Sequence, residues 1–252
     1  MLTDAFKKAD LPPQPEPKRK IVIAVDGPAA SGKGTLAKAL AARLGYAYLD
    51  TGALYRILAL ATLKTGGDPA KLEDVKPALE ILKHLTPDSL ADAALRSPEV
   101  AEAAARVAVI PEVRAVIRDY QNGFAKNPPG NAGGVVLDGR DIGTVVCPDA
   151  DIKFFVTATP EERARRRFEE LKSRTHHLTQ ETVLKDINDR DQRDSSRKIS
   201  PLRAAADAYV LDTTGLTPAE ALEKALNVIR AKFPDASNDN SSGGAQKFKP
   251  GI

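Results

Sequence analysis

Short apolar runs alternate with helical periodicities along most of the chain. The first run, Ile21–Asp26, is β-branched and continuous, which is typical of a strand buried in a parallel sheet. In the segment that follows, Leu36, Leu40 and Leu44 fall on one stripe of a helix. The same reading predicts further strands at Tyr46–Asp50, Gly134–Asp138, Ile152–Val156 and Tyr209–Asp212. This alternation predicts an α/β fold, with a parallel sheet that carries helices on both faces.

Several of the predicted helices have recognisable ends. Gly45 follows the first helix and suits the left-handed position that closes a helix. Thr159 and Thr217 each precede a proline, and Glu162 and Glu220 follow three residues after them, a pattern that predicts a reciprocal capping box. Besides the two helices that start at these threonines, helices are predicted over Ala53–Leu63, Pro98–Val109 and Glu112 to about Phe124.

Three segments depart from this alternation. Residues 64–96 are punctuated by prolines and glycines and are interpreted as an insertion that carries short helical stretches. Residues 1–20 are rich in proline, and residues 233–252 hold few large apolar side chains, so both are predicted to be disordered tails. A single domain is therefore expected over residues 21–232.

Composition narrows the class of protein. Of the 252 residues, 42% are hydrophobic and 28% are charged, the balance of a globular protein long enough to bury a core. A single cysteine, Cys147, excludes a disulfide framework and fits a reducing compartment. The net charge of +3 is too small to indicate nucleic-acid binding, and no apolar run is long enough for a membrane span. No secretory signal is recognisable, so we expect a cytoplasmic protein with neither nucleic acid nor membrane as a partner.

A glycine-rich turn between the first strand and the first helix carries the strongest functional signal. Gly27, four further residues, Gly32 and Lys33 have the spacing and the strand–helix context of a P-loop. Backbone N–H groups of such a turn form a nest for phosphate, and the lysine supplies a mobile charge for the β- and γ-phosphates. The predicted ATP-binding residues are Gly27, Pro28, Ala29, Ala30, Ser31, Gly32, Lys33, Gly34 and Thr35. Gly34 stands where the general pattern has Ser or Thr, a variant that resembles the turn of nucleoside-monophosphate kinases.

Arginines and carboxylates follow other predicted strands, at the edge where ligands of open α/β sheets bind. Arg56 lies about one helical turn past Thr51, and Asp138-Gly139-Arg140-Asp141 follows another strand. A third group shares one predicted helix face through spacings of three and four residues: Arg190, Arg193, Asp194 and Arg197. Taken singly, these groups have plainer interpretations as a surface arginine, an ordinary turn and a solvated ion-pair helix. Together, after a P-loop, they predict a clamp for an anionic phosphoryl acceptor.

Five segments resemble, in order, the pattern of bacterial cytidylate kinases, and the resemblance covers about residues 21–230. They are Gly27–Thr35, Leu49–Arg56, Ile110–Arg114, Leu137–Val146 and Arg190–Arg197. The stretch from Asp138 to Val146 is the most specific of them. The resemblance implies a P-loop NTPase-type sheet and transfer of the γ-phosphoryl group of ATP to CMP or dCMP. It also implies Mg²⁺, carried by ATP rather than by a dedicated protein site, with Thr35 as a candidate ligand.

The resemblance further implies roles for individual residues. The residues implied to bind CMP are Thr51, Arg56, Arg114, Arg140, Asp141, Arg190 and Asp194. Those implied to act in catalysis are Lys33, Arg140, Arg190 and Arg197. Within these sets, Arg56, Arg140 and Arg190 would hold the CMP phosphate, while Arg114 and Asp141 would read the cytosine edge.

By the same resemblance, Arg197 would help to neutralise the transferring group, Asp194 would contact the ribose and Thr51 would lie beside the acceptor. Two features depart from the relatives. Ala105 stands where they usually carry serine, and residues 64–96 are shorter than their small β subdomain.

The expected mechanism is in-line transfer without a covalent enzyme intermediate or a dedicated strong base, driven by positioning and charge neutralisation. Residues 173–186 connect two arginine-bearing helices and are the candidate lid that keeps water from the γ-phosphate. Arg163, Arg166 and Arg167 precede this segment and have two open interpretations, contact with ATP or a solvated helix face. We expect the enzyme to be a monomer.

Three other functions stay open on the sequence alone. One is a P-loop kinase with another small acceptor, such as AMP, UMP or a non-nucleotide. Another is a binding module that hydrolyses ATP slowly, although the arginines at strand ends and the lack of a guanine-reading Asn-Lys-x-Asp motif disfavour a switch protein. The third is an RNA-binding protein that uses Lys18–Lys20 and Arg163–Arg167, for which no aromatic stacking platform is visible.

Overall fold

The computed structural model describes residues 19–86, 89–90, 92–173, 178–197 and 199–234. Most of the two predicted tails, at 1–18 and 235–252, lies outside the described residues, and so does the predicted basic residue Lys18. Residues 174–177, in the middle of the candidate lid, are also outside them.

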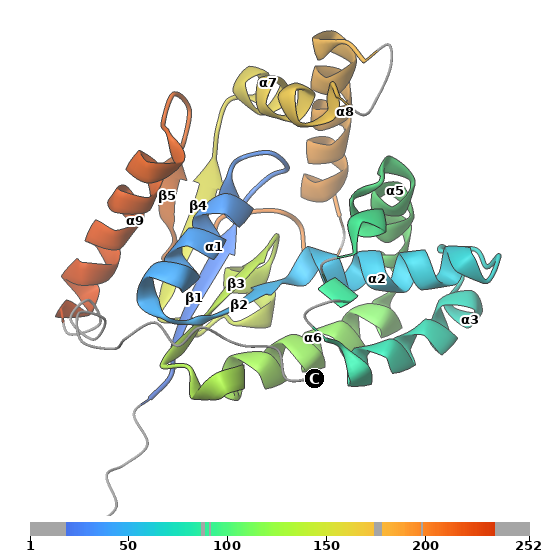
Figure 1. Cartoon of the computed structure of the whole chain (residues 1–252), viewed down its shortest axis with the longest axis horizontal. Coiled ribbons are helices and arrows are strands. Elements are labelled where there is room, and N and C mark those ends of the chain that lie inside the picture. The colour runs from blue at the N-terminus through green and yellow to red at the C-terminus, as the bar shows by residue number, and fades with distance from the viewer. Residues whose placement is uncertain (1–18, 87–88, 91, 174–177, 198, 235–252) are drawn as a thin grey trace, which may run out of the picture.

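Five parallel strands form the centre of the described molecule (Figure 1). They are β1 (Ile21–Asp26), β2 (Ala47–Asp50), β3 (Gly134–Gly139), β4 (Ile152–Thr157) and β5 (Tyr209–Asp212). Their spatial order is β2-β3-β1-β4-β5. All five predicted strands are confirmed, with bounds within one residue of those expected. In register, Asp50 lies opposite Asp138 and Asp26 lies opposite Gly139, so carboxylates of three strands gather at one edge of the sheet.

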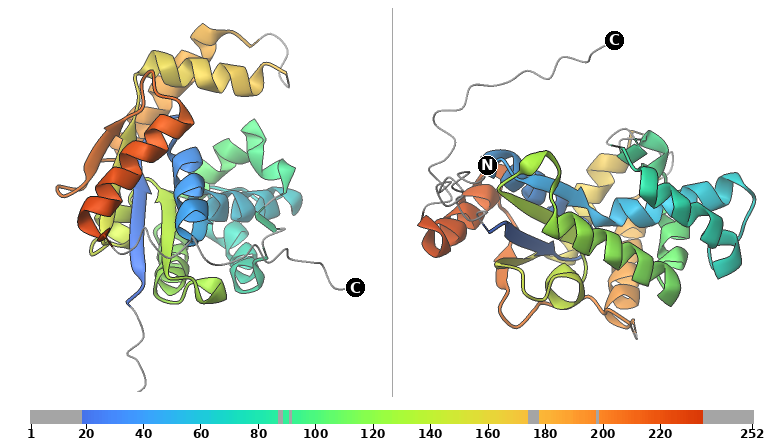
Figure 2. Two further views of the ribbon diagram at one scale, coloured as in Figure 1. Left: turned by 60° about the vertical axis from the view of Figure 1, so that its left-hand side comes forward. Right: turned by 90° about the horizontal axis from the view of Figure 1, so that it is seen from below.

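Helices cover both faces of the sheet, as predicted (Figure 2). The helices α1 (Lys33–Leu44) and α9 (Pro218–Lys232) pack on one face, while α2 (Thr51–Lys64), α5 (Pro98–Val107) and α6 (Pro111–Lys126) pack on the other. Along β1, Ile23 and Val25 enter the first core and Ala24 enters the second, because neighbouring strand residues point to opposite faces. The fold is the P-loop NTPase-type α/β fold that the sequence predicts.

The irregular segment at 64–96 is built from short helical pieces within the described residues. These are α3 (Leu72–Val75) and the 3-10 helices η1 (Lys76–His84) and η2 (Ala93–Arg96). Val75, Ala78 and Leu82 are buried in the core that α2, α5 and α6 share. The segment therefore extends that core, and its action as an insertion over the acceptor stays a prediction.

Two further helices, α7 (Pro160–Leu171) and α8 (Gln180–Ser195), stand beyond the carboxyl edge of the sheet (Figure 1). We call this pair the arm. Its small apolar core contains Ala164, Val183 and Ile187, and Ala30 from the glycine-rich turn packs against it. Two short turns, η3 (Pro129–Asn131) and the π-helical η4 (Ile142–Val146), flank β3. None of the described helices is both long and apolar enough to span a bilayer.

The predicted helix ends are confirmed in all but one detail. Gly45 closes α1 at a φ of 66°, and Thr217 forms a reciprocal capping box with Glu220. Thr159 accepts the N–H of Glu162 at the start of α7, but the predicted return bond from Glu162 is absent and that part of the prediction is wrong. The Thr159 N–H instead donates to the hydroxyl of Thr214 at 3.0 Å. The Glu162 carboxylate is taken by two guanidinium groups of α7, which bind it more strongly than one backbone N–H would.

Candidate active site

The phosphate-binding turn, residues 27–32, connects β1 to α1 at the carboxyl edge of the sheet. Ala30 and Gly32 have φ values of 58° and 87° on either side of Ser31, an alternation that turns N–H groups of the backbone towards one side. Gly32 supplies no side-chain cap to α1, so the first N–H groups of this helix stay available to an anion. A Cβ at Gly27 would lie 2.0 Å from the carbonyl oxygen of Val156, which only glycine avoids. The turn has the construction of a phosphate nest.

Lys33 begins α1, and its ammonium lies 3.2 Å from Oδ1 of Asp138 at the end of β3. Asp138 is only 4% exposed, and Tyr48 donates a long hydrogen bond to its other carboxylate oxygen. Burial lowers the pKa of Lys33, while the neighbouring Asp138 opposes that shift. Lys33 is thus held by a buried carboxylate beside the nest.

Asp26, the last residue of β1, fastens the turn to the segment that follows β3. Its two carboxylate oxygens accept separate N–H groups, from Ile142 at 2.9 Å and from Gly143 at 2.7 Å. Burial raises the pKa of Asp26 to about 7, and the two hydrogen bonds act in the opposite direction. Sequence reasoning missed this residue, because its partners lie 116 and 117 positions away and leave no local pattern.

Three arginines surround Asp194 on α8, and we call these four residues the Asp194 cluster. The carboxylate lies 3.0 Å from Arg140, 2.6 Å from Arg197 and 4.0 Å from Arg190. Burial alone would raise the pKa of Asp194, but Arg140 and Arg197 outweigh it and hold that pKa below its usual value. Arg140 also donates to the carbonyl oxygen of Gly27 at 2.9 Å. The cluster therefore reaches the phosphate-binding turn.

The prediction of one shared helix face holds for Arg190 and Asp194 only. Arg193 is exposed and donates back to the carbonyl oxygen of Asp189 at 3.2 Å, so its predicted place on this face is wrong. Adjacent residues of a helix point about 100° apart, which separates Arg193 from Asp194. The helix ends at Ser195, and Arg197 reaches the cluster from beyond that end.

Arg56 and Thr51 come from the start of α2, next to the Lys33 side of the site. Asp50 caps this helix through the N–H of Ala53 and forms an ion pair with Arg56 at 2.8 Å. Both side chains of the pair are about one-third exposed, at 32% and 29%. The hydroxyl of Thr51 donates to the carbonyl oxygen of Asp138 at 2.7 Å. Arg56 is thus open to a ligand, while the Thr51 hydroxyl is used within the protein.

Arg114 and Asp141, the predicted base-reading pair, line a pocket of about 240 Å³. Arg114 contacts Asp141 at 2.5 Å and donates to the carbonyl oxygen of Ala108 at 3.2 Å. The full lining is Tyr55, Pro111, Arg114, Ala115, Arg118, Gln121, Asp141, Val145, Val146, Ile199 and Ser200. The volume is below the range for drug-sized ligands and suits a single flat ring. Ala105 is half-buried on α5 and is not one of the lining residues.

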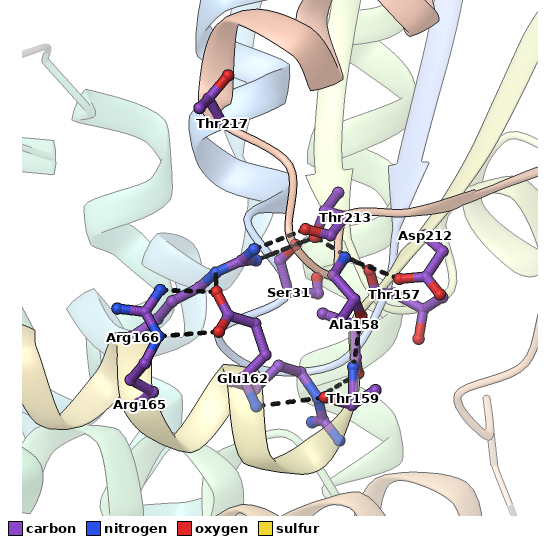
Figure 3. A network of polar contacts seen from close by, with 12 residues as sticks. Ser31, Thr157, Ala158, Thr159, Glu162, Arg165, Arg166, Asp212, Thr213 and Thr217 are labelled. Atoms are coloured by element: carbon purple, nitrogen blue, oxygen red, sulfur yellow. Dashed lines mark hydrogen bonds and ion pairs between the residues drawn. The ribbon is translucent and has the colours of Figure 1, made fainter.

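The arginines of α7 differ in their surroundings, and contact with ATP stays a prediction for all three. Arg163 is buried and donates to the carbonyl oxygens of Ala158 and Ala29. Arg166 reaches the carbonyl oxygens of Ser31 and Thr213, as Figure 3 shows for the network around it. The solvated-face interpretation is wrong for these two, and their internal contacts also disfavour RNA binding. Arg167 pairs instead with Glu170 at 2.8 Å, and its side chain is 30% exposed.

No group of three or more His, Cys, Asp or Glu side chains in the described part of the chain is arranged to hold a metal ion. Hard oxygen donors do lie beside the nest. Oδ1 of Asp138 is buried and accepts no hydrogen bond, although Lys33 is close to it, and Thr35 lies in the first turn of α1. One or two such oxygens fit Mg²⁺ that arrives on a nucleotide, because this ion keeps most of its water ligands.

Sequence comparison places the chain among known proteins. The profile of the family described as cytidylate kinase matches residues 23–231. A cytidylate kinase of Rhodospirillum rubrum is 51% identical over 212 residues, which cover 84% of this chain and 98% of that protein. A cytidylate kinase of Methylocella silvestris is 52% identical over 211 residues, which cover 84% of this chain and 94% of that protein.

A solved structure supports the fold alone. An uncharacterized protein from Eubacterium ventriosum superposes with a TM-score of 0.51 at 13% identity, over 84% of this chain and 99% of its own.

Proposed function

The chain belongs to the cytidylate kinase family, and we propose that the carboxyl edge of its sheet is where it transfers the γ-phosphoryl group of ATP to CMP or dCMP. The products are ADP and CDP or dCDP. The site residues divide into a donor side, around the phosphate-binding turn, and an acceptor side, around the Asp194 cluster and the pocket of Arg114 and Asp141.

On the donor side, the nest and the start of α1 bind the phosphates of ATP through residues 27–35. The Lys33 ammonium lies 3.2 Å from the Asp138 carboxylate, and Asp50 also favours its charged form. An incoming phosphate competes with that carboxylate for the ammonium, which then follows the β- and γ-phosphates. The buried ammonium therefore exchanges the Asp138 carboxylate for a phosphate and keeps an anionic partner throughout.

Thr35 and Asp138 are the residues that would meet Mg²⁺ carried by ATP. When bound, the ion offsets negative charge that builds up on the phosphate oxygens during transfer. The Asp138 carboxylate is suited to this position because Lys33 is its only close counterion among the described residues.

On the acceptor side, Arg56, Arg140 and Arg190 hold the phosphate of CMP. The pocket lined by Arg114 and Asp141 receives the base. Cytosine presents an amine donor at N4 beside acceptors at N3 and O2, which match a carboxylate and a guanidinium held side by side. The 2.5 Å contact between Arg114 and Asp141 orients both groups before the base arrives.

The main partners of the Asp194 carboxylate are arginines of the site. Its carboxylate already bonds Arg140 and Arg197, so the ribose contact that the resemblance implies would share a carboxylate that is largely occupied. We therefore assign to Asp194 the orientation of Arg140, Arg190 and Arg197 for the charge of the transferring group.

The single observation that best supports phosphoryl transfer at this site is that Arg140 contacts both the donor side and the acceptor side. Its Nε donates to Asp194 on the acceptor side, and its Nη1 donates to Gly27 on the donor side. One planar guanidinium therefore spans the gap between the two nucleotides, where charge develops during in-line transfer. We propose that the arm, α7 and α8, excludes water from this gap; residues 174–177 of the candidate lid lie outside the described residues. We also propose a monomer in the cytoplasm, on the sequence features given above.

The test of this function is ADP release with ATP and Mg²⁺, with CMP, dCMP, UMP and AMP offered separately. Turnover confined to CMP and dCMP is expected. Equal turnover with UMP or AMP would support a nucleoside-monophosphate kinase and contradict the assignment of cytosine as the base. ADP release at the same rate with and without an acceptor would favour the alternative of a binding module that hydrolyses ATP.

Replacement of Arg56 with alanine is expected to raise KM for CMP by about 10- to 100-fold, because a charged hydrogen bond to the phosphate is lost. KM for ATP should stay within about twofold, since Arg56 lies on the acceptor side only. The matched control is Arg106→Ala, which removes an arginine whose side chain is 48% exposed and whose Asp68 partner is 3.9 Å away. Steady-state kinetics with each nucleotide varied in turn gives the result, and an equal rise for ATP and CMP would contradict the assignment.

A further inference from the structure

Two arginines of α7 hold the phosphate-binding turn from its outer side. Arg163 donates to the carbonyl oxygen of Ala29 and Arg166 donates to the carbonyl oxygen of Ser31, each over 3.4 Å. The two arginines are one helical turn apart, and the two carbonyl groups belong to alternate peptides of the turn. The spacing of the helix thus matches the spacing of the outward carbonyl groups.

The direction of these carbonyl groups sets the direction of the N–H groups that face phosphate. In a planar trans peptide, C=O and N–H point to opposite sides. When the carbonyl groups of Ala29 and Ser31 point towards α7, the N–H groups of Ala30 and Gly32 point away from it, into the nest. Any contact that fixes these carbonyl groups therefore fixes donors for the phosphates.

Arg166 has the more extensive hold on the turn (Figure 3). It donates to Thr213 twice, at 2.7 Å to the carbonyl oxygen and at 3.0 Å to the hydroxyl. That hydroxyl lies 2.9 Å from the carbonyl oxygen of Ser31 and 3.1 Å from that of Thr157, and Ser31 is the nearer of these two acceptors for its one hydrogen. The contact of Arg166 with Ser31 is thus both direct and relayed through Thr213. Glu162 fixes the guanidinium from the other side, at 2.9 Å. Three segments, α7, the turn and the loop after β5, meet at this one side chain.

We propose that Arg166 is a positioning residue for ATP, which acts through Thr213 and Ser31 to keep the Gly32 N–H directed at the phosphates. The inference rests on the proposed function only in taking ATP as the ligand of this turn. It does not require Arg166 to contact the nucleotide.

Arg165 provides a matched control on the same helix. It shares the Glu162 carboxylate with Arg166, at 2.7 Å, but its side chain is 54% exposed and, among the described residues, it forms no hydrogen bond or ion pair with the turn. Both Arg165→Met and Arg166→Met remove one cation from Glu162. Only the second removes the hold on Ser31 and Thr213.

The experiment measures ATP binding by titration calorimetry on the full chain, without an acceptor. Arg166→Met is expected to weaken ATP binding by about tenfold, the scale of losing hydrogen bonds from a charged donor, and Arg165→Met by less than about twofold. CMP binding should be unchanged in both. An equal weakening of CMP, or the same result for both variants, would overturn the inference as a general loss of structure. Because no acceptor is present, the outcome is separate from any failure to phosphorylate CMP.

Thr213→Val distinguishes action through the turn from direct contact with ATP. It removes the relaying hydroxyl and keeps the Arg166 guanidinium. If Arg166 acts through the turn, this variant also weakens ATP binding, and the double variant loses less than the product of the two single losses. If Thr213→Val binds ATP normally while Arg166→Met binds it weakly, the proposal that Arg166 acts through Thr213 would be overturned.

Discussion

Replacement of Lys33 with methionine is expected to lower kcat for CMP phosphorylation by about 1,000-fold, the scale of losing one preorganised electrostatic donor. The methionine keeps most of the hydrocarbon stem and removes the charge that follows the transferring phosphoryl group. KM for CMP should change little, because the acceptor side does not use this residue. Steady-state ADP release measures the effect, and Lys38→Met, the same change at an exposed position of α1, is the matched control. Turnover within about tenfold of wild type would contradict the role of Lys33.

The same substitution has a structural effect that must be separated from the chemical one. Without Lys33 the buried Asp138 carboxylate loses its counterion, and we expect the free energy of unfolding to fall by about 2 kcal/mol. Adding Asp138→Asn to Lys33→Met removes both charges and should restore much of this stability. Activity should not return in the double variant. Recovery of activity together with stability would mean that Lys33 is structural only.

The fold could be predicted from the sequence because its signals are local. Ile21–Asp26 is an apolar run next to a glycine-rich turn, and the Thr217–Glu220 box is complete within four residues. The error at Thr159 shows the limit of local signals. The same cap pattern is present there, but Glu162 lies within reach of Arg165 and Arg166, and Thr214 arrives from a distant loop to take the N–H.

The candidate site also contains residues that local motifs predict and contacts that they do not. The nest and Lys33 follow from one contiguous motif, and the arginines of the acceptor side follow from motifs that a family resemblance supplied. The contacts that assemble them are long-range: Arg140 bonds partners 54 and 113 residues away, and Arg163 bonds the carbonyl of Ala29 across 134 residues. Such pairs depend on how β1, β3 and the arm pack together, which no local pattern encodes. For this reason the sequence was compatible with a solvated position for Arg163, whereas the structure shows that its side chain is buried.

Asp194→Asn is expected to lower kcat/KM for CMP by about 100-fold and the free energy of unfolding by about 2–3 kcal/mol. The substitution keeps the shape of the side chain and removes the charge that holds Arg140, Arg190 and Arg197 together. The carboxylate is 3% exposed, whereas Arg140 and Arg197 are each 18% exposed, so solvent relieves part of their repulsion. Urea unfolding and CMP kinetics measure the two effects. Asp189→Asn is the matched control on α8, because that carboxylate is 53% exposed and contacts Lys185 at the surface.

A dependence on anions identifies the cause of the Asp194→Asn defect. If three crowded arginines without a counterion destabilise the variant, then added sulfate should stabilise it more than the wild type, since sulfate replaces the missing charge. CMP should do the same, because its phosphate is the anion that this cluster is proposed to hold. If the defect came from a lost hydrogen bond alone, sulfate would raise the stability of both proteins equally. That result would mean that Asp194 has a packing role and that contacts other than its charge hold the three arginines together.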